Sequence, residues 1–162
     1  MRIGQAVDAH ALVAGRPLWL GGVEVPHDRG LEGHSDGDVL LHAVTNAVLG
    51  ALGEGDLGRH FPSSDPELLG VASADLLTRV ARMMRGAGFC VGNVDATIVA
   101  QEPRLAAHLG KMQAVIADVL ETQTRRVNVK VTSTDRMGFT GRGEGIAALA
   151  VVLLRSEGEG GA

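Results

Sequence analysis

Residues 146–154 constrain the fold of this chain more than any other stretch. They are apolar without interruption, a pattern typical of a strand buried on both faces of a sheet. The helices expected elsewhere in the chain can cover only one face of that sheet. The other face needs a second cover, and another copy of the chain is the simplest one, so we expect an oligomer.

The rest of the pattern predicts strands and helices that alternate within one domain. The length of 162 residues suits a single core. We expect an α/β fold, or α+β in two layers, with a mixed four- to five-stranded sheet and its helices on one face. The domain spans residues 1–155, and 156–162 are expected to form a disordered tail. Strands are expected at 2–7, 89–101, 127–133 and 146–154, a hairpin at 18–25, and helices at 38–52, 74–86 and 104–121.

Local signals predict how the helices and loops of this domain begin and end. Asp36 and Ser73 are the expected N-caps of the first two helices, and Gly53 is expected to end the first in a left-handed conformation. Residues 53–70 are rich in Gly, Pro, Ser and Asp, which predicts a long loop. A glycine-rich turn is expected at 138–145.

Composition excludes several classes of function. The formal net charge is −4 and aromatic residues make up only 2%, so nucleic-acid binding is not expected. There is one cysteine, Cys90, which excludes a disulfide within the chain and suits a reducing compartment. No apolar run is long enough to span a membrane, and the N-terminus resembles neither a signal nor a transit peptide. We therefore expect a cytoplasmic protein without a membrane partner.

Asp8 and His10 form the first candidate site, at the end of the first expected strand. Residues i and i+2 point to the same side of a strand, so a carboxylate and an imidazole are presented together. A third ligand would complete an open catalytic zinc site. His42 is the first choice, and His34, Asp36 and Asp38 are alternatives. Two readings without a metal also stand: a hydrogen-bonded Asp8–His10 pair, and an Asp38–His42 pair on one helix face.

Three further polar clusters are candidates for phosphate binding. Residues 34–38 place an imidazole, a hydroxyl and backbone N–H groups at a helix start, which favours anions, although a plain N-cap is the simpler reading. Residues 56–65 form a Pro- and Gly-fixed loop with two serines, or an ordinary surface loop. Residues 130–144 bring hydroxyls, an acid and arginines together among glycines, where Asp135 could hold a hard divalent ion.

The combination and order of these motifs resemble the 2-C-methyl-D-erythritol 2,4-cyclodiphosphate synthase family over residues 1–155. Each motif is weak alone, and the ordered set is specific. The motifs are Asp8-x-His10, His34-Ser35-Asp36-Gly37-Asp38, His42, Asp56-x-Gly58, Phe61-Pro62 with Asp65, Asn93-Val94-Asp95-Ala96-Thr97-Ile98 and Gly138-Phe139-Thr140-Gly141-Arg142-Gly143-Glu144-Gly145.

The resemblance implies an enzyme of the non-mevalonate isoprenoid pathway. It would convert 4-diphosphocytidyl-2-C-methyl-D-erythritol 2-phosphate to the 2,4-cyclodiphosphate and release CMP. The implied assembly is a homotrimer with its sheets around a threefold axis and its active sites between neighbours. Two alternatives remain, a zinc-dependent phosphoesterase and a non-catalytic trimeric module that binds isoprenoid diphosphates.

The resemblance also implies roles for individual residues. Asp8, His10 and His42 would hold Zn²⁺, and Asp135 a Mg²⁺ or Mn²⁺ ion. His34 and Ser133 would stabilise the transition state. The other implied substrate contacts are Ser35, Asp56, Leu57, Gly58, Phe61, Pro62, Ser63, Ser64, Asp65, Ala100, Arg104, Leu105, Thr132 and Thr134, together with Phe139 and Arg142, which would lie near the threefold axis with Glu144.

Some positions depart from the usual pattern of that family. Ser133 stands where threonine is common, and Asp135 where glutamate is common. Asn46 replaces a frequent aspartate, and Ser63-Ser64 a common Asp-Thr. The first two departures bear on the geometry of the second metal site. Serine keeps the hydroxyl of threonine but lacks its methyl group, and the carboxylate of aspartate reaches one methylene less than that of glutamate.

Overall fold

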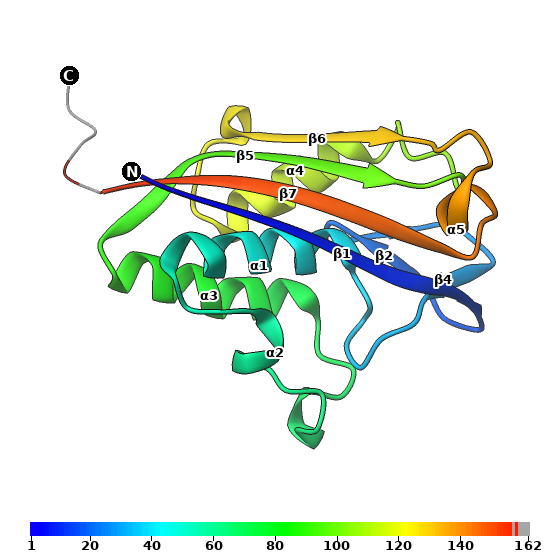
Figure 1. Cartoon of the computed structure of the whole chain (residues 1–162), viewed down its shortest axis with the longest axis horizontal. Coiled ribbons are helices and arrows are strands. Elements are labelled where there is room, and N and C mark those ends of the chain that lie inside the picture. Colours follow the sequence, from blue (N-terminus) through cyan, green and yellow to red (C-terminus); the bar gives the residue numbers. More distant parts are fainter. Residues whose placement is uncertain (157, 159–162) are drawn as a thin grey trace.

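The computed structural model describes residues 1–156 and 158. A five-stranded sheet in the order β4-β1-β7-β5-β6 forms its centre, as Figure 1 shows. The strands β5 and β6 run parallel, and the other neighbours are antiparallel. The sheet is therefore mixed, as predicted. Its strands are β1 (Arg2–Ala14), β4 (Arg29–Leu31), β5 (Phe89–Val99), β6 (Val127–Thr132) and β7 (Gly145–Ser156).

The expected hairpin and the long helices are also present. The hairpin consists of β2 (Leu18–Leu20) and β3 (Val23–Val25), joined at two glycines with positive φ. The long helices are α1 (Val39–Leu52), α3 (Ser73–Gly86) and α4 (Leu109–Val119). Short helical turns interrupt two segments expected as loop or turn: α2 (Leu57–His60), η1 (Pro66–Leu68) and α5 (Gly138–Gly141), with η2 (Thr124–Arg126) before β6.

The long helices cover one face of the sheet (Figure 1). The helix α1 packs on β1 and β7, α3 on α1 and β5, and α4 on β6. Helix α1 approaches β1 closely at Gly4, where a Cβ would overlap the carbonyl oxygen of Ala47. This contact needs glycine, and it brings the first turns of α1 against the far end of β1, where the candidate metal ligands lie.

Several boundaries differ from the sequence prediction. The strand β1 continues to Ala14 instead of ending at residue 7, because its backbone pairs with β7 and then with β4 beyond the polar side chains. Helix α4 begins at Leu109 rather than at 104, because the preceding residues form turns. Residues 157 and 159–162 of the expected tail lie outside the described residues, and Ser156 belongs to β7.

The caps of α1 and α3 also differ from the prediction. Asp38, not Asp36, is the N-cap of α1 and accepts a hydrogen bond from Leu41 N. Ser73 is the first residue of α3 rather than its cap. Asp36 accepts the hydrogen bond from Ser73 N instead, at 2.9 Å, so it caps the second helix from outside. The expected left-handed end of α1 at Gly53 is confirmed, with φ 80°.

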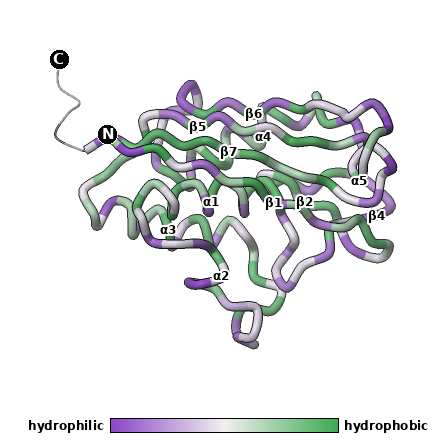
Figure 2. Tube along the Cα trace, viewed as in Figure 1, coloured by the Kyte–Doolittle hydropathy of each residue, from purple (hydrophilic) through white to green (hydrophobic). Residues whose placement is uncertain are grey.

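The face of the sheet opposite the helices carries exposed apolar side chains. In Figure 2 the central strand β7 is hydrophobic over most of its length. Leu149 and Val151 of β7 are 41% and 39% exposed, and Ile3 and Val7 of β1 are 69% and 62% exposed. Val7 is paired with Leu149 in the register, so these side chains form one patch. The apolar patch is available for contact with another molecule.

Among the described residues, no helix is both long enough and apolar enough to cross a lipid bilayer.

Candidate functional site

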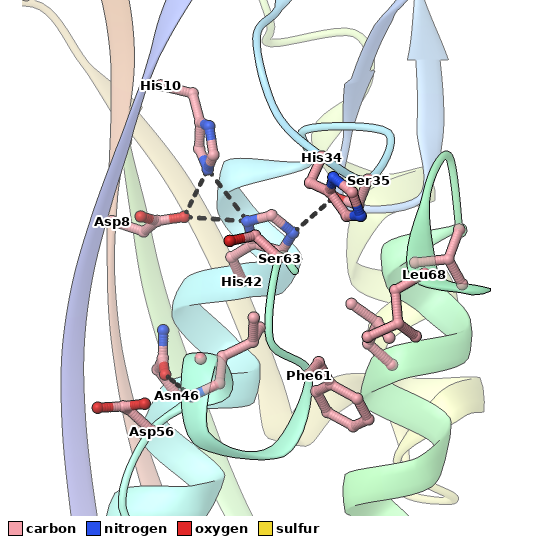
Figure 3. Close-up of a pocket in the computed structure, with 14 residues that line it drawn as sticks. Asp8, His10, His34, Ser35, His42, Asn46, Asp56, Phe61, Ser63 and Leu68 are labelled. Carbon is pink, nitrogen blue, oxygen red and sulfur yellow. Dashed lines mark hydrogen bonds and ion pairs between the residues drawn. The ribbon is translucent and has the colours of Figure 1, made fainter. Parts of the chain in front are cut away.

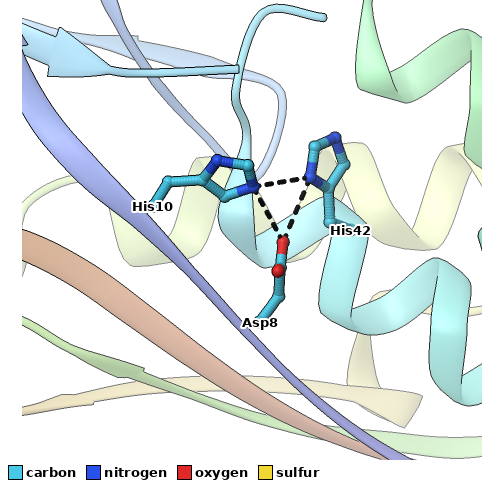
Figure 4. A group of neighbouring side chains, drawn as sticks. All are labelled: Asp8, His10 and His42. Atoms are coloured by element: carbon cyan, nitrogen blue, oxygen red, sulfur yellow. Dashed lines mark hydrogen bonds and ion pairs between the residues drawn. The ribbon is translucent and has the colours of Figure 1, made fainter. Parts of the chain in front are cut away.

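Asp8, His10 and His42 form a compact cluster between β1 and α1 (Figure 4). Asp8 Oδ2 lies 3.0 Å from His10 Nε2 and 3.1 Å from His42 Nδ1. The two ring nitrogens are 3.1 Å apart. The i, i+2 spacing on the strand places Asp8 and His10 on the helix-facing side, and the first turn of α1 supplies His42. The structure thus joins the three residues that the sequence suggested.

The geometry of this cluster suits a divalent metal ion. One carboxylate and two neutral imidazoles are a typical set for a catalytic site that keeps a fourth position open. Ligand atoms about 2.0–2.2 Å from zinc in a tetrahedron lie roughly 3.3 Å from one another, close to the separations found here. The carbonyl of Glu32 accepts a hydrogen bond from His10 Nδ1. In the neutral ring the proton is therefore on Nδ1, and Nε2, on the side of Asp8, is unprotonated and can bind a metal ion.

The electrostatics of the cluster favour positive charge at its centre. Burial raises the pKa of the Asp8 carboxyl, but its contacts with the His10 and His42 rings outweigh burial and hold that pKa well below its usual range. The hydrogen bond with Asp8 raises the pKa of His10, although burial opposes it. A carboxylate that stays ionised beside two imidazoles is the environment that a cation requires.

Asp38 does not belong to the Asp8–His10–His42 group, which we call the metal cluster because its side chains could hold a metal ion. Its fully buried carboxylate accepts hydrogen bonds from Gly21 N, Gly22 N and Leu41 N at 2.7–3.0 Å. It joins the β2–β3 turn to the start of α1. The Asp38–His42 pair that the helical spacing allowed is therefore not formed, because backbone donors occupy the carboxylate.

A cavity of about 380 Å³ opens beside the metal cluster (Figure 3). The cluster forms one end of it, and α2 with the following loop forms the other. The predicted site residues on its wall are Asp8, His10, His34, Ser35, His42, Asp56, Leu57, Gly58, Phe61 and Ser63. His34 Nε2 lies 3.1 Å from the carbonyl oxygen of Asp65, which anchors its ring. Pro62, Ser64 and Asp65 are not among the lining residues.

The remaining predicted residues lie elsewhere, where β5 and β6 end side by side. Ala100 N donates to Thr132 O, which ties the two strand ends together. Ser133 Oγ donates to Asp135 Oδ1 at 3.2 Å, and both side chains are exposed. Arg104 is exposed, whereas the side chains of Ala100 and Leu105 are buried in the core. Those two residues can offer a ligand only backbone groups.

Residues of the glycine-rich turn form a third group. Arg142 Nε donates to Glu144 Oε1 at 2.7 Å, and Phe139 is 43% exposed. Thr134 lies just before this turn, and its hydroxyl donates to Met137 O. None of these residues lines the cavity beside the metal cluster.

Asn46 is a cavity residue that the sequence analysis noted only as a departure. Its Oδ1 accepts a hydrogen bond of 2.7 Å from Leu57 N, which fixes the start of α2. Leu68, Val71 and Leu76 complete an apolar wall. Leu68 ends η1, Val71 lies in the following loop and Leu76 in α3. Their side chains carry no polar group, so nothing in the sequence marked them as site residues.

Comparisons with known proteins agree with this geometry. The model of the YgbB family matches residues 1–155. A 2-C-methyl-D-erythritol 2,4-cyclodiphosphate synthase of Geotalea daltonii is 58% identical over 159 residues, covering 98% of this chain and 93% of that protein. Among solved structures, a synthase of the same name in its CDP-bound form is 31% identical with a TM-score of 0.87, covering 95% of this chain and 100% of the other.

A longer solved protein matches over part of its length. The bifunctional IspDF of Campylobacter jejuni is 41% identical with a TM-score of 0.92, and the match covers 96% of this chain but 42% of that one. The fold, the Asp8–His10–His42 cluster and the full-length relatives agree, and the chain belongs to the YgbB family.

Proposed function

We propose that this chain converts 4-diphosphocytidyl-2-C-methyl-D-erythritol 2-phosphate to 2-C-methyl-D-erythritol 2,4-cyclodiphosphate and releases CMP. The observation that carries the proposal is the Asp8–His10–His42 cluster at one end of a cavity, in a chain whose relatives are named 2-C-methyl-D-erythritol 2,4-cyclodiphosphate synthase. The proposal includes a cytoplasmic location, which the single cysteine suits.

Asp8, His10 and His42 would hold a zinc ion through one carboxylate oxygen and two ring nitrogens. Bound zinc supplies a Lewis acid that withdraws charge from a phosphate oxygen. We assign a second divalent ion, Mg²⁺ or Mn²⁺, to Asp135, whose exposed carboxylate is a hard oxygen ligand.

The reaction is an internal phosphoryl transfer. An oxygen of the 2-phosphate forms a bond to the β-phosphorus, the bond from that phosphorus to the bridging oxygen breaks, and CMP leaves with the electron pair. Such reactions depend on position and charge neutralisation more than on covalent work by the protein. We assign the positioning of the methylerythritol part to His34, Ser35, Asp56 and the backbone at Leu57–Gly58, which share the cavity.

Stabilisation of the transition state is assigned to His34 and Ser133. The His34 ring, anchored on Asp65, borders the cavity. Ser133 lies in the other cluster, with Thr132, Thr134 and the 100–105 segment, for which we propose binding of the cytidine diphosphate part. Because these residues do not line the cavity beside the metal ligands, a neighbouring subunit would have to bring them there.

The proposed assembly is a homotrimer. Its support is the apolar patch of Ile3, Val7, Leu149 and Val151, which lies on the sheet face that none of the described helices covers. Burial of such side chains in an interface is favourable by about 25 cal/mol per Å² of apolar surface. Light scattering on the purified chain would give the mass of three subunits, and a stable monomer would contradict the assembly.

Phosphorus NMR of the purified protein with the cytidyl diphosphate substrate and Mg²⁺ tests the reaction. The expected products are CMP and a cyclic diphosphate, with neither formed by His42→Ala. Release of inorganic phosphate would support a phosphoesterase instead. Ligand binding without turnover, preserved in His42→Ala, would support the non-catalytic binding module.

A further inference from the structure

A chain of hydrogen bonds lies behind His42, on the side of its ring away from the metal cluster. His42 Nε2 is 2.9 Å from Ser73 Oγ at the first residue of α3. The same hydroxyl donates to Asp36 Oδ1. Ser73 is fully buried and His42 is 8% exposed. The sequence prediction treated Ser73 only as a helix cap, and Asp36 as a helix cap, an alternative metal ligand and part of the 34–38 cluster. The proposed reaction assigns neither residue a part.

The direction of these hydrogen bonds follows from the number of protons available. A carboxylate offers only acceptors, and a serine hydroxyl has one proton to donate. That proton points to Asp36, so toward His42 the Ser73 oxygen can act only as an acceptor. His42 Nε2 must then carry the proton and donate it to Ser73. In a neutral ring, Nδ1 is left unprotonated, and Nδ1 is the atom that faces Asp8 and His10.

Asp36 is itself held by the backbone. Its Oδ2 accepts a hydrogen bond from Ser73 N at 2.9 Å, and its Oδ1 accepts one from Asp38 N at 3.1 Å. Asp36 N in turn donates to Val71 O. The carboxylate therefore has little freedom to turn away from the Ser73 hydroxyl, and its place at the start of α3 suits a negative charge.

Ser35 is a second neighbour of His42 Nε2, but it cannot set the proton position in the same way. Its Oγ lies 3.1 Å from Nε2 and accepts a hydrogen bond from Gly37 N. No carboxylate receives its proton in the described structure. Ser35 can therefore either donate to the ring or accept from it, whereas Ser73 can only accept.

We propose that Ser73 and Asp36 are positioning residues that fix His42 in the Nε2–H tautomer, so that Nδ1 is presented as a metal ligand before the metal arrives. The inference rests on the metal site proposed above and deepens it. Partners of this kind orient a ligating histidine and typically change metal affinity about 10- to 100-fold when they are removed.

A purely structural role is the competing explanation, because the same hydrogen bonds join α1 to α3. It predicts a loss of stability when Ser73 or Asp36 is changed, with the His42 tautomer unaffected. The test must therefore measure which nitrogen of the His42 ring carries the proton. Nitrogen-15 NMR of the histidine side chains separates the two neutral tautomers, and competition with a chelator gives the Zn²⁺ dissociation constant.

The variants are Ser73→Ala, which removes the acceptor, and Asp36→Asn, whose amide can donate to the Ser73 hydroxyl and reverse its direction. Thr78→Val is the matched control, because Thr78 is a hydroxyl residue of α3 that donates only to its own helix, at Ala74 O. The full chain is used throughout, stripped of metal for NMR and titrated with Zn²⁺ for affinity.

In the wild type and in Thr78→Val, we expect a single Nε2–H tautomer of His42 in the metal-free protein. In Ser73→Ala and Asp36→Asn we expect mixed or reversed tautomers, with the Zn²⁺ dissociation constant raised roughly 10- to 100-fold. If Ser73→Ala does not fold, Asp36→Asn alone decides, because it keeps the shape of the side chain.

Two results would overturn the inference: an unchanged tautomer in a folded variant, or Zn²⁺ affinity within twofold of wild type. Failure of the metal site itself looks different. In that case the wild type binds no Zn²⁺ at the Asp8–His10–His42 cluster, and the variants have no affinity to lose.

Discussion

The metal cluster and the Ser133–Asp135 turn differ in how completely one chain builds them. In each histidine of the cluster, the ring nitrogen that faces away from the cluster makes a hydrogen bond, His10 with the Glu32 carbonyl and His42 with the Ser73 hydroxyl. Asp135 has only Ser133 as a side-chain partner in the described structure and is exposed, with φ 51°. The turn thus presents a hydroxyl and a carboxylate to solvent, whereas Asp8 and His10 are partly buried and His42 is buried.

This difference indicates that the side chains of the Asp8–His10–His42 cluster are held more firmly than those of the Ser133–Asp135 turn. A metal site needs ligands fixed before binding, because each ordered side chain costs entropy that binding must otherwise offset. The turn can remain open in the isolated chain if a nucleotide, a cation and a neighbouring subunit complete it.

The largest effect is expected for Asp8→Asn. The amide keeps the shape of the side chain but removes the charge from the ligand set. We expect Zn²⁺ to be lost and kcat/KM to fall by at least about 10³-fold, since several kcal/mol of charge stabilisation disappear. Metal analysis of the purified variant with steady-state kinetics provides the measurement. A variant that retains one Zn²⁺ per chain and full turnover would remove Asp8 from the site.

Ser133→Ala tests the other region without touching the metal ligands. Loss of one donor to a developing oxyanion costs about 10²- to 10³-fold in kcat. We expect a fall of this order with Zn²⁺ content unchanged. Ser133→Thr serves as the control and should retain turnover, because it keeps the hydroxyl. Undiminished turnover in the alanine variant would exclude Ser133 from the reaction.

Asp135→Asn is the matched counterpart of Asp8→Asn. Weakened binding of the second cation should lower kcat/KM about 10- to 100-fold at limiting Mg²⁺, and excess Mg²⁺ should restore part of it. Zn²⁺ content should remain at the wild-type level. A titration of activity against Mg²⁺ checks this, and an unchanged curve would argue against a cation at Asp135.

The smallest effect is expected for Asn46→Ala. The Leu57 N–H group loses its acceptor, which costs about 1 kcal/mol of stability. Because α2 then starts less firmly beside the cavity, we expect KM to rise by roughly fivefold with little change in kcat. Urea denaturation and steady-state kinetics together would detect both changes. A large fall in kcat would instead give Asn46 a role in the chemical step.

The spacing of Asp8 and His10 predicted that these two side chains would be presented together, and the family resemblance selected His42 as the third metal ligand. Alternation along a strand places Asp8 and His10 on one side, and the first turn of the next helix offers His42. The apolar run at 146–154 likewise predicted a central strand with one face left to cover. The Asp8–His10 pairing and the central strand both follow from the periodicity of regular structure.

The support for His42 could not be predicted in the same way. Local rules assigned Asp36 and Ser73 to the caps nearest to them in sequence. The chain instead returns after 37 residues, so that Asp36 binds Ser73. Local sequence patterns cannot predict a contact between residues so far apart. Asp36 bonds to the start of α3 and Asp38 caps α1, and this division of roles depends on the position of α3.

A mixed-subunit experiment tests the central claim, that one chain supplies the metal half of each active site and its neighbour the Ser133–Asp135 half. His42→Ala chains and Ser133→Ala/Asp135→Asn chains would be co-expressed with different tags, and the hybrid assemblies isolated. Each parent is assayed alone as the control. In a cyclic trimer that contains both kinds of chain, one shared site in about three combines two intact halves.

We predict that the isolated hybrids regain activity, to about a third of the wild-type level per chain. If each active site were instead built within a single chain, every site would carry one of the two defects. The hybrids would then be no more active than the parents, and that result would contradict the account.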